Sequence, residues 1–208
     1  MSEFTQYATL PEDNPPQKKK INIIHELVDY LELIVLSVCV VIVLFTFVAR
    51  LCTVEGESML HTLNERDSLI VSDMFYTPER GDVIVFHQTG TTDGRYDEPL
   101  VKRVIATGGE TVSLTYAYDY MTVEITHTDG TYETLEEPYV RFDPKESRYP
   151  IGYKVTYTVP ENHMFVMGDN RTNSLDSRSF EIGFVDTRRV LGKVLFRVQP
   201  LSDCGAIQ

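Results

Sequence analysis

Cysteine is scarce in this sequence, with three among 208 residues, and the three offer no disulfide framework. Cys39 lies inside a long apolar run, so only Cys52 and Cys204 remain as a pair for an oxidising compartment. One sequence does not show whether these two meet. The sequence also has no Cys or His cluster with metal-ligand spacing, and we expect no metal and no cofactor.

Basic residues are few as well. The formal net charge is -12, and residues 53–208 hold 25 acidic side chains against 15 basic ones. Nucleic acid repels such a surface, and a polybasic lipid-binding surface needs the opposite balance. Nucleic acid is therefore excluded as an expected partner.

Long apolar runs are missing except for one. Leu33–Ala49 contains 17 consecutive uncharged residues, which as a helix would rise about 26 Å, near the lower limit for crossing a bilayer. We predict a transmembrane helix over residues 31–51, with the N-terminus in the cytoplasm because Lys18–Lys20 precede it. A buried core helix and a cleaved signal peptide are the weaker alternatives, the latter because Phe47 stands where a cleavage site needs a small residue.

The parts on either side of this run differ in composition. Residues 1–30 mix Pro, Lys and acids, which predicts a disordered cytoplasmic tail. Residues 52–208 form the predicted extracytoplasmic domain, with no indication of a helix of ordinary length or an internal repeat.

That domain is predicted to be mainly β, a sheet or barrel-like fold. Stretches rich in Val, Ile, Tyr and Thr alternate with turn residues; they are SLIVSD, DVIVFH, PLVKRVIA, ETVSL, MTVEIT, YKVTYTV, HMFVM and VLGKVLFRV. Residues 115–153, rich in Tyr, Glu and Asp, are interpreted as an excursion from the core sheet.

The segment GESMLHTL, residues 56–63, places Ser58 three residues before His61. A serine hydroxyl is a weak nucleophile until a base takes its proton, and histidine is the usual base. Along an extended chain, however, these two side chains point to opposite faces unless a tight turn intervenes. The Ser/His pair is therefore the weaker hypothesis.

Lysine is the other workable base, provided that burial lowers its pKa. Four lysines follow residue 52. Three of them lie among charged residues or on a strand face that is not expected to bury the amine: Lys145, Lys154 and Lys193. Lys102 shares its strand face only with apolar residues: Leu100, Val104 and Ala106. Lys102 is the candidate base, the alternative being a strand-edge lysine whose head reaches water.

Four motifs follow one another along the chain: Ser58-Met59 with Thr62-Leu63, RGDVIVF at 80–86, KRVIATGGETV at 102–112, and GDNRTNSLDSR at 168–178. In this order they resemble the motifs of bacterial type I signal peptidases, membrane-anchored Ser/Lys proteases that cut signal peptides from exported proteins. The resemblance spans the apolar run and the domain after it. The size is similar to the compact form found in Gram-positive bacteria.

The resemblance implies roles for individual residues. Ser58 matches the nucleophile and Lys102 the general base. Ser174 matches a second serine that orients the lysine amine, while Asp176 and Arg178 match the pair that braces its loop. An ordinary polar turn between strands is the alternative interpretation of this last motif.

Some further positions match the substrate-binding pockets of the family, and two others depart from the family pattern. The resemblance implies shallow apolar pockets that receive small substrate side chains at the first and third positions before the cut. The residues that match these pockets are Met59, Leu63, Leu100 and Val101, and each could equally be a core residue. His61 stands where many relatives have proline. Gly56 stands where many relatives have a Ser or Thr whose hydroxyl donates to the oxyanion. The oxyanion hole is therefore expected to depend chiefly on the backbone N–H of Ser58.

The implied function is that of a membrane-bound serine endopeptidase that cuts after A-x-A-like ends. The implied topology is a single pass through the cell membrane, with the catalytic domain on the extracytoplasmic side. Implied partners are the signal peptides of exported preproteins and the lipid bilayer, with the export translocon as a further candidate. Two alternatives are a soluble self-cleaving Ser/Lys domain, which has no use for residues 33–49, and a non-catalytic anchored chaperone, which would not need Ser58 and Lys102.

Overall fold

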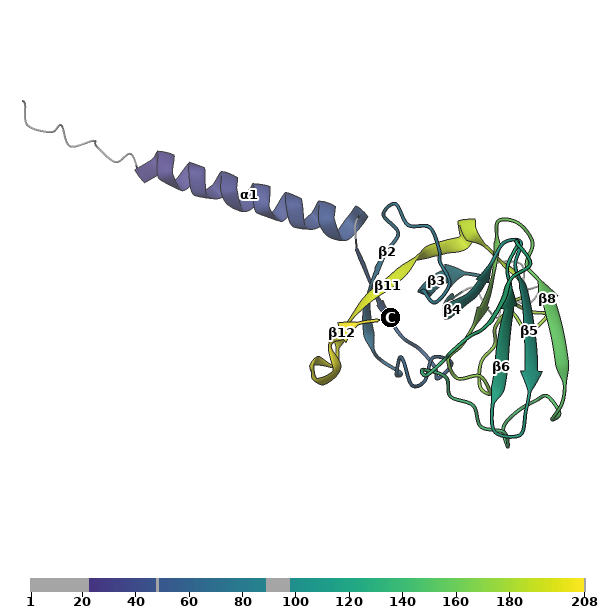
Figure 1. Ribbon diagram of the computed structural model, residues 1–208. Coiled ribbons are helices and arrows are strands. Elements are labelled where there is room, and N and C mark those ends of the chain that lie inside the picture. Colours follow the sequence, from purple (N-terminus) through teal and green to yellow (C-terminus); the bar gives the residue numbers. More distant parts are fainter. Residues whose placement is uncertain (1–22, 48, 89–97, 208) are drawn as a thin grey trace, which may run out of the picture. The chain divides into compact units, whose positions relative to one another are not determined.

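The computed structural model describes residues 23–47, 49–88 and 98–207. The chain divides into two compact units between Ile42 and Val43. The first holds most of helix α1, Ile23–Phe47, and the second holds the strands (Figure 1).

Helix α1 and the first strand differ in their bounds from the predicted helix over residues 31–51. The helix begins at Ile23, within the segment predicted to be disordered, because hydropathy marks an apolar run and not the helix-forming polar residues before it. It ends at Phe47, and strand β1, Arg50–Thr53, pairs with a later strand that the local sequence does not reveal. Among the described residues, no helix has the length and apolar character of a membrane span. The remainder of the predicted tail, residues 1–22, lies outside the described residues.

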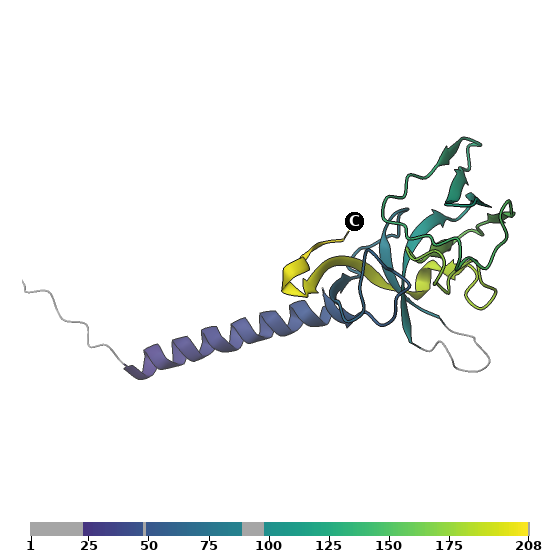
Figure 2. The ribbon, with the colours of Figure 1, turned by 90° about the horizontal axis from the view of Figure 1, so that it is seen from below.

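The larger of two antiparallel sheets has eight strands in the order β1-β2-β11-β3-β4-β9-β10, with β12 paired to β11. Its strands are β1 (Arg50–Thr53), β2 (Ser68–Ser72), β3 (Val83–His87), β4 (Pro99–Thr107), β9 (His163–Met167), β10 (Val185–Asp186), β11 (Val190–Gln199) and β12 (Gly205–Ala206). Strand β11 lies between β2 and β3, and the C-terminal segment runs back beside it (Figures 1 and 2).

The smaller sheet has four strands in the order β7-β6-β5-β8. Its strands are β5 (Thr111–Tyr116), β6 (Met121–Thr126), β7 (Tyr132–Thr134) and β8 (Lys154–Thr158). Within the described residues after α1, the helical turns are η1 (Thr187–Arg189) and η2 (Leu201–Asp203).

The mainly β prediction is confirmed, and each of the eight predicted stretches contains a strand. The strands that periodicity missed are short, two to four residues, and such lengths carry little alternation: β1, β7, β10 and β12. The segment predicted to leave the core sheet falls within the smaller sheet and its connections.

Three apolar clusters form the core of the two sheets. One joins β4 and β9 of the larger sheet to β5 and β6 of the smaller, for example through Ile105, Phe165 and Leu114. A second lies beneath the segment that carries Ser58 and includes Met59, Leu63, Leu69, Val83 and Val194. A third, with Ile84, Phe86, Val104 and Val166, packs on the opposite face of the larger sheet. The second and third clusters hold β3 and β4, and with them Lys102, in a fixed place.

Candidate active site

Ser58 lies in the turn that joins β1 to β2. The residue after it, Met59, is 1% exposed, and Leu63 is fully buried, so both anchor the turn in the core. The Leu63 N–H donates to the Met59 carbonyl at 2.8 Å, which closes the turn. Ser58 itself stays half-buried. The apolar residues around the serine thus bury the turn and leave its hydroxyl accessible.

Lys102 reaches the same point from the middle of β4. Its backbone pairs with Ile84 of β3, and its side chain is buried, with 3% of the residue exposed. The lysine Nζ lies 2.7 Å from the Ser58 Oγ and donates to the Val101 carbonyl at 2.9 Å. The two groups that chemistry requires are therefore in hydrogen-bond contact.

Burial lowers the pKa of Lys102 to about 8, because the charged ammonium is poorly solvated there. The carboxylates of Asp176 and Asp169 oppose this shift, and the Arg178 guanidinium adds to it. An amine with this pKa is neutral in about a tenth of molecules at pH 7 and in most at pH 9. Lys102 can thus act as a base at a pH where an exposed lysine cannot.

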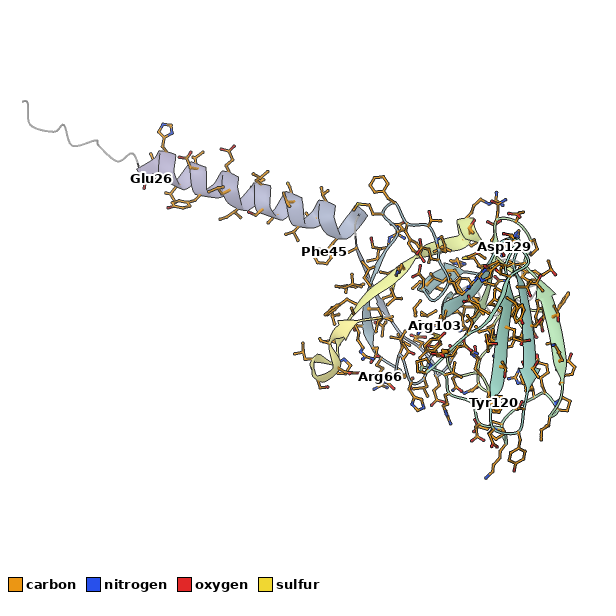
Figure 3. All side chains as sticks on the ribbon, in the orientation of Figure 1. Glu26, Phe45, Arg66, Arg103, Tyr120 and Asp129 are labelled. Atoms are coloured by element: carbon orange, nitrogen blue, oxygen red, sulfur yellow. The ribbon has the colours of Figure 1, made fainter. Side chains whose placement is uncertain are left out.

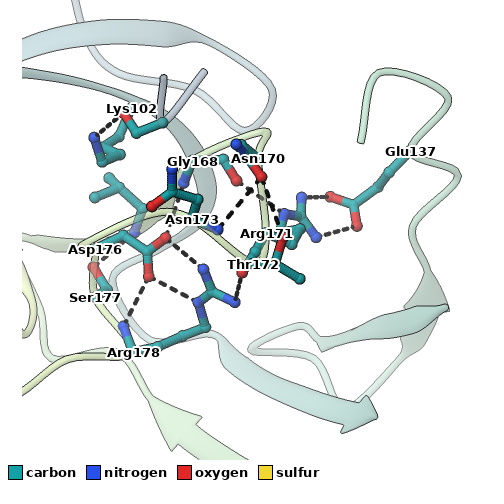
Figure 4. A network of polar contacts seen from close by, with 12 residues as sticks. Lys102, Glu137, Gly168, Asn170, Arg171, Thr172, Asn173, Asp176, Ser177 and Arg178 are labelled. Carbon is teal, nitrogen blue, oxygen red and sulfur yellow. Dashed lines mark hydrogen bonds and ion pairs between the residues drawn. The ribbon is translucent and has the colours of Figure 1, made fainter. Parts of the chain in front are cut away.

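The segment 168–178 follows β9 and lies beside Lys102 (Figure 4). Two Arg178 nitrogens each lie 2.8 Å from a carboxylate oxygen of Asp176, and both side chains are buried. The Gly168 N–H donates to the same carboxylate at 3.0 Å. Burial alone would raise the pKa of Asp176, but Arg178 and the Gly168 N–H lower it below its usual range. The pair therefore stays ionised and ties the end of the segment to its beginning.

The same segment holds the backbone of Ser58. The Asn170 N–H donates to the Ser58 carbonyl at 3.0 Å, and its side-chain amide donates to the Glu57 carbonyl at 3.0 Å. A Cβ on Gly168 would come closer than 3.0 Å to both the Ser58 carbonyl and the Ser174 Oγ. Only glycine allows this approach, and the close packing fixes the nucleophile against the last motif.

A cleft of about 400 Å³ opens at the pair. It is lined by Ser58, Lys102, residues 52–55 and Met59 on the Ser58 side, and residues 98–101 with Val85 on the other. On one edge, residues 99–101 of β4 pair with β3, whereas β9 pairs only with residues 103–107 of β4. In the described part of the chain, the second edge of residues 99–101 is thus not paired by a strand and is open to an extended chain.

Comparison with known proteins supplies the family. The model of the family "Signal peptidase, peptidase S26" matches residues 27–199. The chain belongs to this family. A probable signal peptidase I of Synechocystis is 34% identical over 181 residues, with 84% of each chain covered. Signal peptidase I of Bacillus caldolyticus is 36% identical over 179 residues, covering 80% of this chain and 88% of that one.

The comparison with solved structures adds one further similar protein. The crystal structure of a signal peptidase I from Enterococcus faecalis V583 is 31% identical and covers 57% of this chain and 97% of that one, with a TM-score of 0.40. The family assignment rests on the sequence matches. Signal peptidases I are serine endopeptidases that act on the signal peptides of preproteins, and this chain is one of them.

The predicted residues of this signal peptidase do not all lie where the resemblance places them. Ser58, Lys102, Asp176 and Arg178 come together as described. The Ser174 hydroxyl lies against Gly168, and the structure shows no hydrogen bond between it and Lys102 within the described residues. Met59, Leu100 and Val101 line the cleft, whereas Leu63 lies in the core away from it.

Arg103 and Asp169 form a buried ion pair that alternation along β4 did not reveal. The guanidinium donates to both oxygens of Asp169, at 2.9 and 2.8 Å, and lies 3.9 Å from the ring centre of Tyr139. The Thr62 hydroxyl also donates to Asp169, which links the Ser58 turn to this pair. Figure 3 shows Arg103 inside the β domain. Alternation along β4 puts Arg103 on the face opposite to that of Lys102, and its local pattern does not mark it as a buried charge.

A second buried pair joins the middle of the chain to the site. Arg171 donates to both oxygens of Glu137 at 2.7 and 2.5 Å, and both side chains are buried (Figure 4). Glu137 lies in the segment that the sequence assigned to an excursion, and nothing in its local pattern marked it. The excursion therefore supports the last motif of this signal peptidase.

The two departures and the cysteines also have defined places. His61 is exposed, and no hydrogen bond joins it to Ser58 within the described residues. Gly56 has a φ of 84°, in the region that favours glycine. Cys52 and Cys204 are both free.

Proposed function

We propose that Ser58 is the nucleophile of this signal peptidase and Lys102 its general base. The 2.7 Å contact between Lys102 Nζ and Ser58 Oγ supports this proposal most strongly, because a base must reach the proton that it takes. The lowered pKa of the lysine supports it independently. His61, the alternative base, is exposed, and in the described part of the chain it makes no hydrogen bond to Ser58.

In the proposed reaction, neutral Lys102 takes the hydroxyl proton as the Ser58 oxygen attacks the scissile carbonyl carbon. The tetrahedral adduct breaks its C–N bond, and the Lys102 ammonium returns the proton to the leaving amine. A water molecule, deprotonated by Lys102, then attacks the resulting ester. The carboxylate product leaves, and the proton goes back to the Ser58 oxygen.

The oxyanion of the adduct needs a donor near Ser58. Within residues 23–47, 49–88 and 98–207, the Ser58 N–H is engaged in no hydrogen bond, so it is available for this role. Gly56 brings no side-chain donor. Loss of such a donor typically costs about 3 kcal/mol of transition-state stabilisation. The backbone N–H of Ser58 is proposed to supply this stabilisation instead.

The substrate is proposed to be the extended end of a signal peptide, of A-x-A type. Its backbone would pair with the open edge of residues 99–101, and small side chains would enter shallow pockets beside Met59, Leu100 and Val101. Large side chains are rejected there by volume. Ser174, Asp176 and Arg178 are assigned to holding the lysine amine and its loop.

We also propose that residues 31–51 anchor the chain in the cell membrane by a single pass, with residues 1–30 in the cytoplasm and residues 52–208 as the extracytoplasmic catalytic domain. The apolar run Leu33–Ala49 supports this. The anchor would keep the enzyme beside lipid-embedded signal peptides and the export translocon, which raises the effective substrate concentration. Protease digestion of intact cells tests the topology: residues 52–208 should be cleaved and residues 1–30 protected.

The dyad is tested by incubating detergent-solubilised protein with a preprotein. Ser58→Ala and Lys102→Ala should each abolish cleavage, while His61→Ala should retain it. Full cleavage by either of the first two variants would overturn the assignment. Loss of cleavage in His61→Ala, with a His-like pH midpoint in the parent enzyme, would return the role of base to histidine.

A further inference from the structure

One residue, Asn170, holds both of the peptide groups that flank the Cα atom of Ser58. Its backbone N–H donates to the Ser58 carbonyl, and its side-chain Nδ2 donates to the Glu57 carbonyl, each at 3.0 Å. Because a peptide group is planar, fixing the groups before and after a Cα atom also fixes the direction of its Cα–Cβ bond. Asn170 thus holds the proposed nucleophile from both sides along the chain.

The orientation of the Asn170 side chain is set by its other contacts. Its Oδ1 accepts hydrogen bonds from the Thr172 hydroxyl at 3.3 Å and from the Asn173 N–H at 3.4 Å (Figure 4). An amide oxygen only accepts and an amide NH2 only donates, so these two donors direct the NH2 group towards the Glu57 carbonyl. Asn170 is fully buried, and bulk water does not compete for its amide.

The backbone around Asn170 is fixed by Arg141, in the segment that the sequence assigned to an excursion. The Arg141 N–H donates to the Asp169 carbonyl, and the Arg171 N–H donates to the Arg141 carbonyl, both at 2.8 Å. These two bonds form a parallel bridge between Arg141 and Asn170. The backbone that carries the amide is therefore anchored independently of Ser58.

The Glu57 carbonyl and the Ser58 N–H belong to the same peptide group. This peptide bond is trans, so its C=O and N–H point in opposite directions, and a donor that holds the oxygen also sets the direction of the N–H. The Leu60 N–H donates to the same oxygen at 3.3 Å, and Asn170 supplies the shorter contact. A hydrogen bond to the oxygen also polarises the group and makes its N–H a stronger donor.

We infer that Asn170 is a positioning residue for the oxyanion hole, because its side-chain amide holds the Glu57–Ser58 peptide group and so directs the Ser58 N–H. This inference rests on the proposed function, in which that N–H is the oxyanion donor. Since Gly56 brings no side-chain donor, the hole depends on the direction of this one N–H. Asn170 does not line the substrate cleft, so its effect falls on the transition state and not on substrate binding.

Two variants remove the side-chain donor and keep the backbone contact to Ser58. Asn170→Asp retains the shape and the oxygen that Thr172 and Asn173 contact, and at pH 9 its carboxylate repels the Glu57 carbonyl. Asn170→Leu removes the donor without adding a charge. In both we expect kcat at pH 9 to fall about tenfold to 100-fold, towards the loss of a whole oxyanion donor, with KM unchanged.

Asn64→Asp and Asn64→Leu are the matched controls. Asn64 lies in the same connection between β1 and β2, is exposed, and does not line the substrate cleft. Both control variants should retain the parent kcat. They repeat the change in charge and in polarity without removing a contact to the peptide group before Ser58.

Two further measurements show whether the rest of the site is intact. Tm is measured for every variant, and rates are compared below the lowest value, so that unfolding is not counted as lost rate. If Asn170→Leu does not fold, Asn170→Asp decides the test. Where Asn170→Leu folds, the pH midpoint of its kcat/KM should stay at about 8, because it adds no charge near Lys102.

A pair of inhibitors separates a misdirected N–H from a general disturbance of the site. A peptide aldehyde of A-x-A sequence accepts the Ser58 oxygen at its carbonyl carbon, and its own oxygen then occupies the oxyanion hole. The corresponding peptide alcohol binds in the cleft without forming this adduct. In the Asn170 variants the aldehyde should bind about tenfold to 100-fold less tightly, the same factor as the loss in kcat, and the alcohol as in the parent.

A parent-like kcat in the folded Asn170 variants, or equal weakening of aldehyde and alcohol, would overturn the inference. Failure of the dyad is seen separately in Ser58→Ala, which should not cleave a preprotein and should bind the aldehyde no more tightly than the alcohol. Cleavage by Ser58→Ala would overturn the proposed function. An inactive Ser58→Ala beside parent-like Asn170 variants would remove only the role of Asn170.

Discussion

The Lys102 amine lies 2.7 Å from the Ser58 hydroxyl oxygen, although 44 residues separate the two along the chain. Strand β4 and the β1–β2 turn bring them together, and Asn170 in the segment 168–178 holds the Ser58 carbonyl. The contact is polar, but its surroundings exclude water from the amine, and the proposed chemistry depends on that combination.

Activity should rise with pH as Lys102 loses its proton. With a pKa of about 8, kcat/KM is expected to increase about tenfold per pH unit below pH 7 and to level off above pH 9. Lys102→Arg keeps the positive charge but has no accessible neutral form, so it should be inactive from pH 6 to pH 10. A plateau already reached at pH 7, or activity in Lys102→Arg, would remove the lysine from the role of base.

The buried amine should also reduce the stability of the fold. Its folded pKa of about 8 lies below the value of 10.5 for a free lysine, so the folded state binds a proton less readily. The penalty, about 3 kcal/mol, is fully present below pH 8 and disappears as pH rises to 10.5. Lys102→Met should therefore raise Tm by about 5–10 °C at pH 7, and the gain should shrink between pH 8 and pH 10.5. A gain that does not change with pH would reflect packing alone.

Gly168 is expected to tolerate no side chain. The Cβ of Gly168→Ala would push on the Ser58 carbonyl and on Ser174, and a shift of about 1 Å at a nucleophile can lower the rate about 100-fold. Gly205→Ala is the control, because nothing lies within 4 Å of its Cβ and its φ is not positive. Cleavage assays on both should separate them clearly; similar activity would show that the close approach is not needed.

The sequence predicted much of this arrangement and missed what depends on distant contacts. The strand stretches and the desolvated face of Lys102 were readable because alternation and burial have a local period. The Arg103–Asp169 and Arg171–Glu137 pairs were not, because each joins positions far apart in the chain and an isolated charged residue normally indicates a solvated surface. Leu63 was assigned to a pocket by its motif, yet it lies in the core, since the motif gives identity but not direction.

The Asp176–Arg178 pair should be far more important to stability than an exposed pair of the same kind. Arg178→Met leaves a buried carboxylate without its partner, which typically costs about 3–5 kcal/mol and should lower Tm by about 10 °C. The comparison is Arg188→Met, which breaks the pair with Asp186, where the arginine side chain is 87% exposed. Equal changes in Tm for the two variants would mean that burial does not set the strength of the first pair.

The central claim is that Ser58 carries the acyl group, and peptide mapping of the trapped intermediate tests it most directly. The enzyme is mixed with a preprotein, quenched in acid within one turnover, digested and examined by mass spectrometry. An ester-linked signal peptide on the fragment that contains Ser58, absent from Ser58→Ala and from Lys102→Ala, is the predicted result. An adduct on any other residue, or one that still forms in Ser58→Ala, would contradict the account.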